Sequence, residues 1–194
     1  YEDNRRLKGR EFRPIIYNAI INKQILEITY EKFTGERFTC AVHPYLLKQY
    51  NERWFLFCFF PEAGISHFNL PLDRIVDTPK AVGYYVEDIP SDYRDYFKDI
   101  VGVTRLSGVE PRKIYIGVSD INTWGRVISK PLKTLAVESV YDKEKDYGRV
   151  SMTVIPNMEF YMKILSLGEH VAIESEPERT EMSSIIQRIL NEYK

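Results

Sequence analysis

The sequence from residue 53 to residue 60 reads Arg53-Trp54-Phe55-Leu56-Phe57-Cys58-Phe59-Phe60, and seven of its eight side chains are apolar or aromatic. This run is too short to span a membrane. An apolar run of this length, bounded by Asn51-Glu52 and Pro61, is typical of a strand that is buried on both faces. The stretch therefore predicts an interior strand in the middle of a small sheet.

The composition is that of an ordinary globular protein. The 194 residues are 44% hydrophobic and 28% charged, which suffices for one large or two small domains with a sizeable core. With 27 basic and 28 acidic residues, the formal net charge is −1, which gives no general attraction to nucleic acid or to anionic membranes. Any contact with nucleic acid must then come from a local basic patch.

The cysteines indicate a reducing compartment. Cys40 and Cys58 both occupy apolar positions in strand-like stretches, and the sequence contains no C-x-x-C motif and no signal peptide. We therefore expect buried thiols and a cytoplasmic location. The first residue is Tyr1 rather than Met, which we interpret as the start of a piece of a longer protein.

The first half predicts one helix followed by short antiparallel strands. In order, these are a helix at 12–20 and extended stretches at 26–31, 38–42, 45–48, 53–60 and 67–77. Thr34-Gly35 supplies a hairpin turn, and His43-Pro44 is expected to end its ladder because proline cannot donate a hydrogen bond. These elements fit a small closed or nearly closed, Sm-like β-barrel, because closure removes exposed strand edges.

The second half predicts a different arrangement. Its expected elements are a strand at 114–118, a helix at 121–128, strands at 132–140 and 149–155, a helix from 158, a strand at 171–173 and a helix from 177. Asp120 and Asn157 are suited to cap the first two helices, and Gly168 to end the second. Acidic residues around the start of the last helix are expected to be solvated: Glu174, Glu176, Glu178 and Glu181. The order βαββαβ plus a final helix is the ferredoxin-like plan.

The predicted fold class is α+β, with two domains. Residues 1–11 form a linker or arm, 12–80 the barrel, 81–110 a connection with one short helix, and 111–194 the ferredoxin-like domain.

An ordered set of short motifs resembles the WYL domain of bacterial transcriptional regulators. The motifs are Ile28-Thr29-Tyr30, Val42-His43-Pro44-Tyr45, Trp54-Phe55-Leu56 and Leu72-Asp73-Arg74-Ile75. The second half, with Arg126-Val127-Ile128-Ser129-Lys130-Pro131-Leu132 and the final Pro177 helix, is similar to the WCX extension that commonly follows WYL. The chain departs from the family where the motif tyrosine is Phe55, and where Phe68 and Pro71 stand in place of basic residues.

The resemblance implies a ligand-sensing module. Such regulators carry a winged helix-turn-helix upstream, so DNA would be read by a domain that precedes this chain. The barrel would bind an effector such as an anion, a nucleotide or a nucleic acid, and the second domain would transmit the signal or form a homodimer. No cofactor is implied.

Arg74 is the main candidate for ligand binding. It lies between Leu72 and Ile75 and next to Asp73, so its guanidinium is either the structural partner of a carboxylate or a fork that binds an anion. Tyr30 and Tyr45 are either ligand contacts or packing residues with a solvated hydroxyl.

The other candidates surround the same strands. His43, His67 and Asn69 are further ligand-binding candidates, and Trp54 is a core residue of the barrel that could also face a ligand. Two histidines without a carboxylate at ligand spacing do not predict a metal site.

The sequence lacks the usual signatures of catalysis, among them G-x-S-x-G, a Walker loop, G-x-G-x-x-G after a strand and H-E-x-x-H. We therefore expect no enzymatic activity. Two alternatives to the sensor remain: a single-stranded nucleic-acid binder, in which Tyr30, Tyr45 and Trp54 stack on bases beside Arg74, and a structural dimerisation unit.

Overall fold

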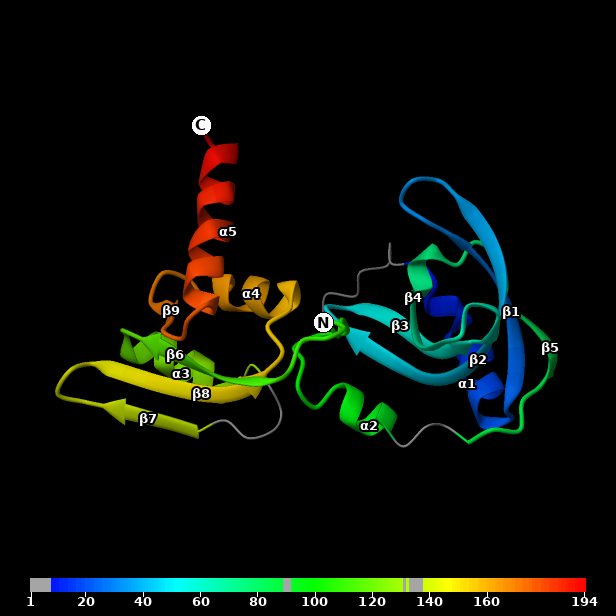
Figure 1. The fold of residues 1–194 in the computed structure, drawn as a ribbon, viewed down its shortest axis with the longest axis horizontal. Coiled ribbons are helices and arrows are strands. Elements are labelled where there is room, and N and C mark those ends of the chain that lie inside the picture. The colour runs from blue at the N-terminus through cyan, green and yellow to red at the C-terminus, as the bar shows by residue number, and fades with distance from the viewer. Residues whose placement is uncertain (1–7, 89–91, 131, 133–137) are drawn as a thin grey trace. The chain divides into compact units, whose positions relative to one another are not determined.

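A computed structural model describes residues 8–88, 92–130, 132 and 138–194. The chain divides into two compact units, residues 1–90 and 91–194 (Figure 1). Each unit has its own antiparallel sheet and its own helices. The predicted α+β class is therefore confirmed, while the division at residues 12–80, 81–110 and 111–194 stays a prediction.

The described residues of the first unit, 8–88, form one α-helix and five strands. They are α1 (Arg13–Ile21), β1 (Gln24–Glu31), β2 (Arg37–Tyr50), β3 (Arg53–Phe60), β4 (Ile65–Pro71) and β5 (Lys80–Tyr84), with 3-10 helices η1 (Arg10–Phe12), η2 (Pro61–Ala63) and η3 (Leu72–Arg74). The sheet order is β4-β3-β2-β1-β5, and each neighbouring pair is antiparallel. Closure of this sheet into an Sm-like barrel stays a prediction.

The stretch at residues 53–60 is an interior strand, as expected. β3 lies between β2 and β4, with Leu56 opposite Leu47 on one side and Leu70 on the other. Its four central residues, Phe55–Cys58, are all buried, so side chains on both faces are removed from water. The middle place in the sheet belongs to β2, however.

The two cysteines are buried free thiols, as predicted. Burial raises the pKa of Cys40 to about 11 and raises that of Cys58 well above its ordinary value. Both thiols are thus held protonated, the less reactive form.

The break expected at His43-Pro44 is wrong. β2 continues through both residues for 14 residues in all and changes partner there. Up to Val42 it pairs with β1, and from His43 onward it pairs with β3. Pro44 stays in register opposite Cys58, and a register shift between Pro44 and Leu46 places Tyr45 outside the regular register.

Two further parts of the first unit differ from expectation. The extended run predicted for residues 67–77 is interrupted by η3, which turns the chain at Leu72–Arg74. β5 was not predicted, because most of its side chains are exposed and its pattern is weak. It forms by pairing with β1, a long-range contact that local sequence does not encode. The first sheet therefore extends to Tyr84, beyond residue 80 where the barrel was predicted to end.

The second unit contains the elements that the sequence predicts, in the predicted order. They are α2 (Asp92–Tyr96), β6 (Arg112–Val118), α3 (Ile121–Ser129), β7 (Glu138–Asp142), β8 (Tyr147–Val154), α4 (Met158–Leu165), β9 (Val171–Ile173) and α5 (Glu178–Glu192). The sheet order is β7-β8-β6-β9. Part of the strand predicted at 132–140 lies outside the described residues, and β7 begins at Glu138.

The predicted caps of this unit are confirmed. Asp120 accepts a hydrogen bond from the backbone N–H of Thr123 at 2.6 Å, and Asn157 accepts one from Phe160 at 2.8 Å. Gly168, with φ of 95°, has the left-handed backbone expected after α4. Both caps satisfy donors that the first helical turn leaves unpaired.

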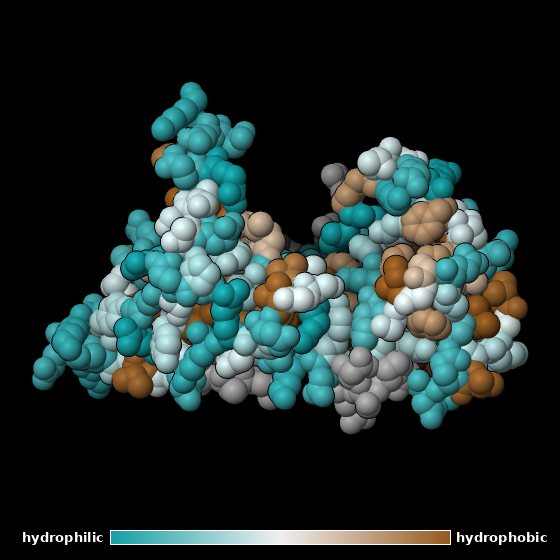
Figure 2. All heavy atoms as spheres, viewed as in Figure 1, coloured by the Kyte–Doolittle hydropathy of each residue, from teal (hydrophilic) through white to brown (hydrophobic). Residues whose placement is uncertain are grey.

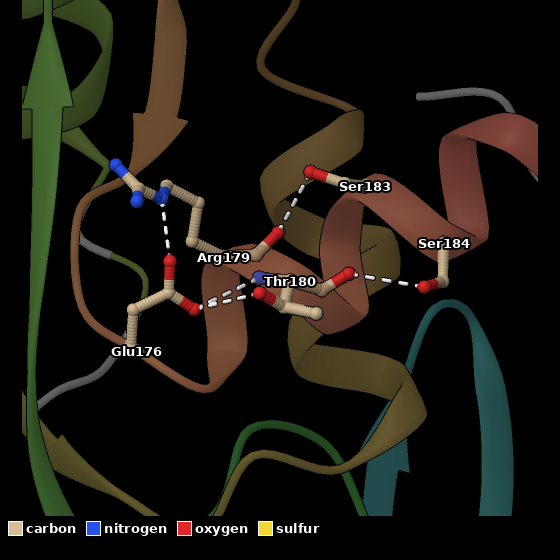
Figure 3. Close-up of polar contacts among 5 residues, drawn as sticks. All are labelled: Glu176, Arg179, Thr180, Ser183 and Ser184. Atoms are coloured by element: carbon tan, nitrogen blue, oxygen red, sulfur yellow. Dashed lines mark hydrogen bonds and ion pairs between the residues drawn. The ribbon is translucent and has the colours of Figure 1, made fainter.

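The start of α5 is capped from outside the helix. One carboxylate oxygen of Glu176 accepts hydrogen bonds from the N–H and hydroxyl of Thr180, and the other accepts one from Arg179, while Ser183 and Ser184 bond back to helix carbonyls (Figure 3). A carboxylate at this position also meets the positive end of the helix dipole.

The expectation that all four glutamates near this helix are solvated is wrong. Glu178 is 1% exposed and pairs with Arg112 at 3.0 Å. Glu174 pairs with Arg149 at 2.6 Å and also accepts a hydrogen bond from the hydroxyl of Tyr147. Arg112 on β6 and Arg149 on β8 reach these carboxylates only once the sheet has folded. The run of acidic residues in the sequence therefore did not reveal the two ion pairs.

Candidate functional site

The candidate site is the turn η3, which carries Arg74. Leu72 is 1% exposed and belongs to the core of the first unit, and the backbone N–H of Ile75 closes the turn on the carbonyl of Leu72 at 3.1 Å. Asp73 and Arg74 follow Leu72 and are both half-buried. The buried leucine therefore fixes the place from which the two charged side chains extend.

Glycine 9 packs directly on this turn. Gly9 has φ of 83°, and a Cβ atom at this position would overlap the carbonyl group of Leu72. The backbone of the segment before α1 thus lies against the backbone of η3. Any larger residue would push the two segments apart.

Asp73 is paired with Arg53 rather than with Arg74. Nη2 of Arg53 donates to both carboxylate oxygens of Asp73, at 2.9 and 2.8 Å. Both side chains are largely buried, at 33% and 25% exposed, so the bonds are protected from water. In the described part of the chain Asp73 thus pairs with Arg53, and no ion pair joins it to Arg74.

Arg74 contacts Tyr30 and Phe33 among the described residues. Its Nη1 donates to the hydroxyl of Tyr30 at 3.3 Å, and its guanidinium carbon lies 3.3 Å from the ring centre of Phe33. Nε of Arg74 is buried and lacks a hydrogen-bond partner in the described part of the chain. Within the described residues the guanidinium thus has an N–H donor, at Nε, without an acceptor, while one of its faces is covered by an aromatic ring.

A second group of polar residues surrounds Glu87. His43 and Tyr45, from β2, both donate hydrogen bonds to the same carboxylate oxygen of Glu87. The ring of Tyr85 stacks on that of His43, with centres 4.9 Å apart, and its hydroxyl donates to the carbonyl of Pro44 at 2.7 Å. These bonds hold the segment after β5 against β2.

The protonation states in this group follow from burial and hydrogen bonding. Burial, the nearby carboxylate of Glu87 and the hydrogen bond to it raise the pKa of Tyr45 well above its ordinary value. Burial and the same carboxylate raise the pKa of Tyr85 to about 12. Burial also raises the pKa of Glu87, but hydrogen bonds from its own backbone amide, from His43 and from Tyr45 outweigh it, so the net pKa is lowered.

The remaining candidates lie elsewhere on the same sheet. His67 and Asn69 are half-buried on β4, with Ser66 beside His67 and Phe57 opposite Asn69. Trp54, at the start of β3, packs against the core of the unit and is covered by the guanidinium of Arg13, 5.0 Å from its ring centre. Trp54 is itself half-buried, so it packs against the core cluster and is not one of its fully buried members.

The candidate ligand-binding residues form separate groups in the structure. Arg74 meets Tyr30, which is opposite Phe38, whereas His43 and Tyr45 meet Glu87. Phe38 and His43 are five residues apart on β2, about 16 Å along an extended strand. Among the hydrogen bonds of the described residues, Arg74 and His43 thus have different partners.

Several residues of these groups were missed from the sequence. Phe33 follows the first strand at its hairpin, where only its place beside Thr34-Gly35 could have drawn notice. Arg53, Tyr85 and Glu87 gave no signal, because each meets its partner only when distant segments pair.

The described residues contain no group of three or more His, Cys, Asp or Glu side chains that could hold a metal ion. Within the same part of the chain, no helix has the length and apolar character needed to cross a membrane.

Comparison with known proteins adds a family match for the first unit. Residues 11–78 match the family model described as the WYL domain. No curated protein sequence matches the chain at a significant level.

Several solved structures, including the following two, are similar to the chain. One is described as proteasome accessory factor B/C (PafBC) of Arthrobacter aurescens, with 13% identity and a TM-score of 0.42, and the match covers 90% of this chain and 26% of that one. The other is a CRISPR Cas-related protein, with 10% identity and a TM-score of 0.50, and the match covers 94% of this chain and 51% of that one. The chain thus spans about a quarter of the length of the first protein and about half of that of the second. The similarity to the CRISPR Cas-related protein concerns the fold alone. The family match, residues 11–78, includes the turn that carries Arg74.

Proposed function

We propose that the chain is a ligand-sensing module of a regulator, and that Arg74 binds an anionic effector. The observation that carries the proposal is a half-buried arginine, inside the stretch that matches the WYL domain, whose neighbouring carboxylate is already taken by Arg53. Its positive charge has no carboxylate partner within the described residues. An anion that enters supplies that partner.

The geometry suits an oxyanion. A guanidinium presents its N–H donors as a planar fork that matches two oxygens of a phosphate or carboxylate. The hydroxyl of Tyr30 accepts from Arg74 and keeps its own proton to donate to the same anion. Partial burial strengthens these charge-assisted bonds, because the local dielectric is lower than that of water.

The wider proposal concerns architecture. The order β4-β3-β2-β1-β5 supports a five-stranded Sm-like barrel, and β7-β8-β6-β9 with its interleaved helices supports a ferredoxin-like second domain. In this proposal the module acts by binding rather than by catalysis, works in the cytoplasm and passes its signal to a DNA-binding domain upstream.

A homodimer is part of the same proposal, and α5 favours it. Large apolar residues are exposed along the second half of this helix and directly after it: Ile186, Ile189 and Leu190, then Tyr193. Figure 2 shows that the side of α5 turned to the viewer is mainly hydrophilic, so the helix is amphipathic beyond its buried contacts. The same residues would support a purely structural dimerisation unit.

A single-stranded nucleic-acid binder built on Tyr30, Tyr45 and Trp54 is less well supported. Tyr30 and Tyr45 are 6% and 4% exposed, and Trp54 is covered by Arg13. Stacking on a base requires an open ring face.

Calorimetric titration and thermal unfolding with inorganic pyrophosphate test the proposed site. We expect pyrophosphate to bind and to raise the melting temperature, and the Arg74→Gln variant to lose both effects. Arg37→Gln is the matched control, because Arg37 lies on the same hairpin but is exposed and pairs with Glu31. Equal binding by wild type and Arg74→Gln would contradict the proposal, and so would the absence of binding at low salt.

A further inference from the structure

Phe33 is an exposed aromatic residue that contacts the candidate site. Its ring lies on one face of the Arg74 guanidinium, 3.3 Å from the guanidinium carbon to the ring centre. Even so, the residue is 82% exposed. Contact on one face together with this exposure leaves the other face of the ring open to solvent.

The hairpin that carries Phe33 is well braced. The N–H of Lys32 donates to the carbonyl of Glu36 at 2.8 Å, and that of Gly35 donates to the carbonyl of Lys32 at 2.9 Å. The side chains of Lys32 and Glu36 form an ion pair at 2.9 Å. Figure 1 shows the connection between β1 and β2 projecting from the rest of the first unit. A large apolar side chain at such a projecting turn is unusual, because turns favour Gly, Asn, Asp and Ser.

The contact decides how an anion approaches Arg74. Because Phe33 covers one face of the guanidinium, an oxyanion meets the group in its plane, where the N–H donors point. A planar ring attached to that anion then reaches the open face of Phe33. Stacking of a base on an aromatic side chain depends on the π-face and tolerates any base.

We propose that Phe33 is a specificity residue, which selects anions that carry an aromatic ring, as nucleotides do. The phosphate binds Arg74 and Tyr30, and the base stacks on Phe33. This inference rests on the proposed function, since it requires an anion at Arg74. A free mononucleotide and a single-stranded oligonucleotide both supply this chemistry.

The test compares two phosphates that differ in the ring. Adenosine 5′-monophosphate and ribose 5-phosphate are titrated calorimetrically against wild type and against the Phe33→Leu, Phe33→Trp, Arg74→Lys and Tyr84→Leu variants. We expect the nucleotide to bind wild type about tenfold more tightly than the sugar phosphate. The ratio of the affinity for the nucleotide to that for the sugar phosphate should fall to about one in Phe33→Leu and stay about tenfold in Phe33→Trp. Arg74→Lys should weaken the binding of both ligands.

Tyr84→Leu is the control for loss of an exposed aromatic, because Tyr84 is 71% exposed on β5 in the same unit. It should leave the ratio unchanged. A residue that only steadies Arg74 would weaken both phosphates equally on replacement, so a ratio that survives in Phe33→Leu overturns the inference. If ribose 5-phosphate binds through Arg74 with no preference for the nucleotide, the inference fails and the proposed function stands. If neither phosphate binds wild type, the proposed function itself fails.

A second arm separates the two sources of the nucleotide. A hexamer of deoxyadenylate is titrated at two salt concentrations beside the mononucleotide. A polymer ligand gives tighter binding and a salt slope that exceeds that of the mononucleotide, because several phosphates are neutralised. Equal affinity and slope for the two ligands identify the mononucleotide.

Discussion

Nη2 of Arg53 donates hydrogen bonds to both carboxylate oxygens of Asp73, at 2.9 and 2.8 Å. The pair links the first residue of β3 to the middle of η3, and among the residues that the structure describes no carboxylate pairs with the next residue, Arg74. One ion pair thus both braces the turn and keeps the neighbouring guanidinium available.

We expect loss of the Arg53–Asp73 ion pair to lower both the stability of the protein and its affinity for anions. Arg53→Gln should lower the free energy of unfolding by about 1.5–3 kcal/mol, because it breaks hydrogen bonds to a largely buried carboxylate. It should also weaken anion binding, since Asp73 is freed to compete for Arg74. Urea unfolding and pyrophosphate titration measure the two effects. Arg37→Gln serves as the control, with a much smaller loss of stability because its ion pair with Glu31 is exposed to solvent. Similar losses in the two variants would contradict the role given to Arg53.

Gly9→Ala tests the backbone contact with η3. Two costs combine at this position, a left-handed backbone and a clash with the carbonyl of Leu72. Gly35→Ala isolates the first cost, because Gly35 has φ of 84° but nothing within 4 Å of its Cβ position. Gly35→Ala should lose about 1 kcal/mol in denaturant unfolding, and Gly9→Ala about 2 kcal/mol more. Equal losses would show that the segment before α1 moves aside freely.

Glu87 predicts a pH-dependent stability. Its pKa in the folded protein is lowered from the ordinary 4.5, so its ionised form stabilises the fold above that value. The contribution fades as the pH falls through the lower folded value. Glu87→Gln should be less stable than wild type by about 1 kcal/mol at neutral pH, the net value of a typical hydrogen bond. The difference should shrink as the pH falls from 4.5 through the lower folded pKa of Glu87.

Urea unfolding of both proteins between pH 7 and pH 3 measures this gap. Glu36→Gln is the control, since Glu36 is exposed and pairs only within its hairpin. A gap that keeps its size at acid pH would show that the carboxylate charge is not what holds residues 85–88 on β2.

Asn157 predicts a large loss of stability in the second unit. Besides capping α4, its side-chain N–H group donates to the carbonyls of Val101 and Thr104, at 2.9 and 2.6 Å, and the residue is 1% exposed. Asn157→Ala should therefore cost more than about 2 kcal/mol, the upper range for a cap alone. Asp120→Ala, which removes a cap only, should cost about 1 kcal/mol. Thermal unfolding ranks the two variants, and a reversed order would contradict the prediction.

The sequence alone determined the elements that rest on local patterns. The apolar run at 53–60 predicts an interior strand, because a continuous run has no polar face to turn to water. Helical spacing predicts α1 and α5, and the caps Asp120 and Asn157 mark where helices begin. Each of these signals depends on residues that are neighbours along the chain.

Tertiary structure alone decided the pairings between distant segments. β5 becomes a strand by bonding to β1, and β2 passes through Pro44 because its partner changes there. At the site, the sequence identified Arg74 and Tyr30 but not that Asp73 turns to Arg53 or that Phe33 covers the guanidinium. A carboxylate beside an arginine in sequence has no reason to pair with it, because the direction of each side chain is set by the turn and by the strands that pack around it.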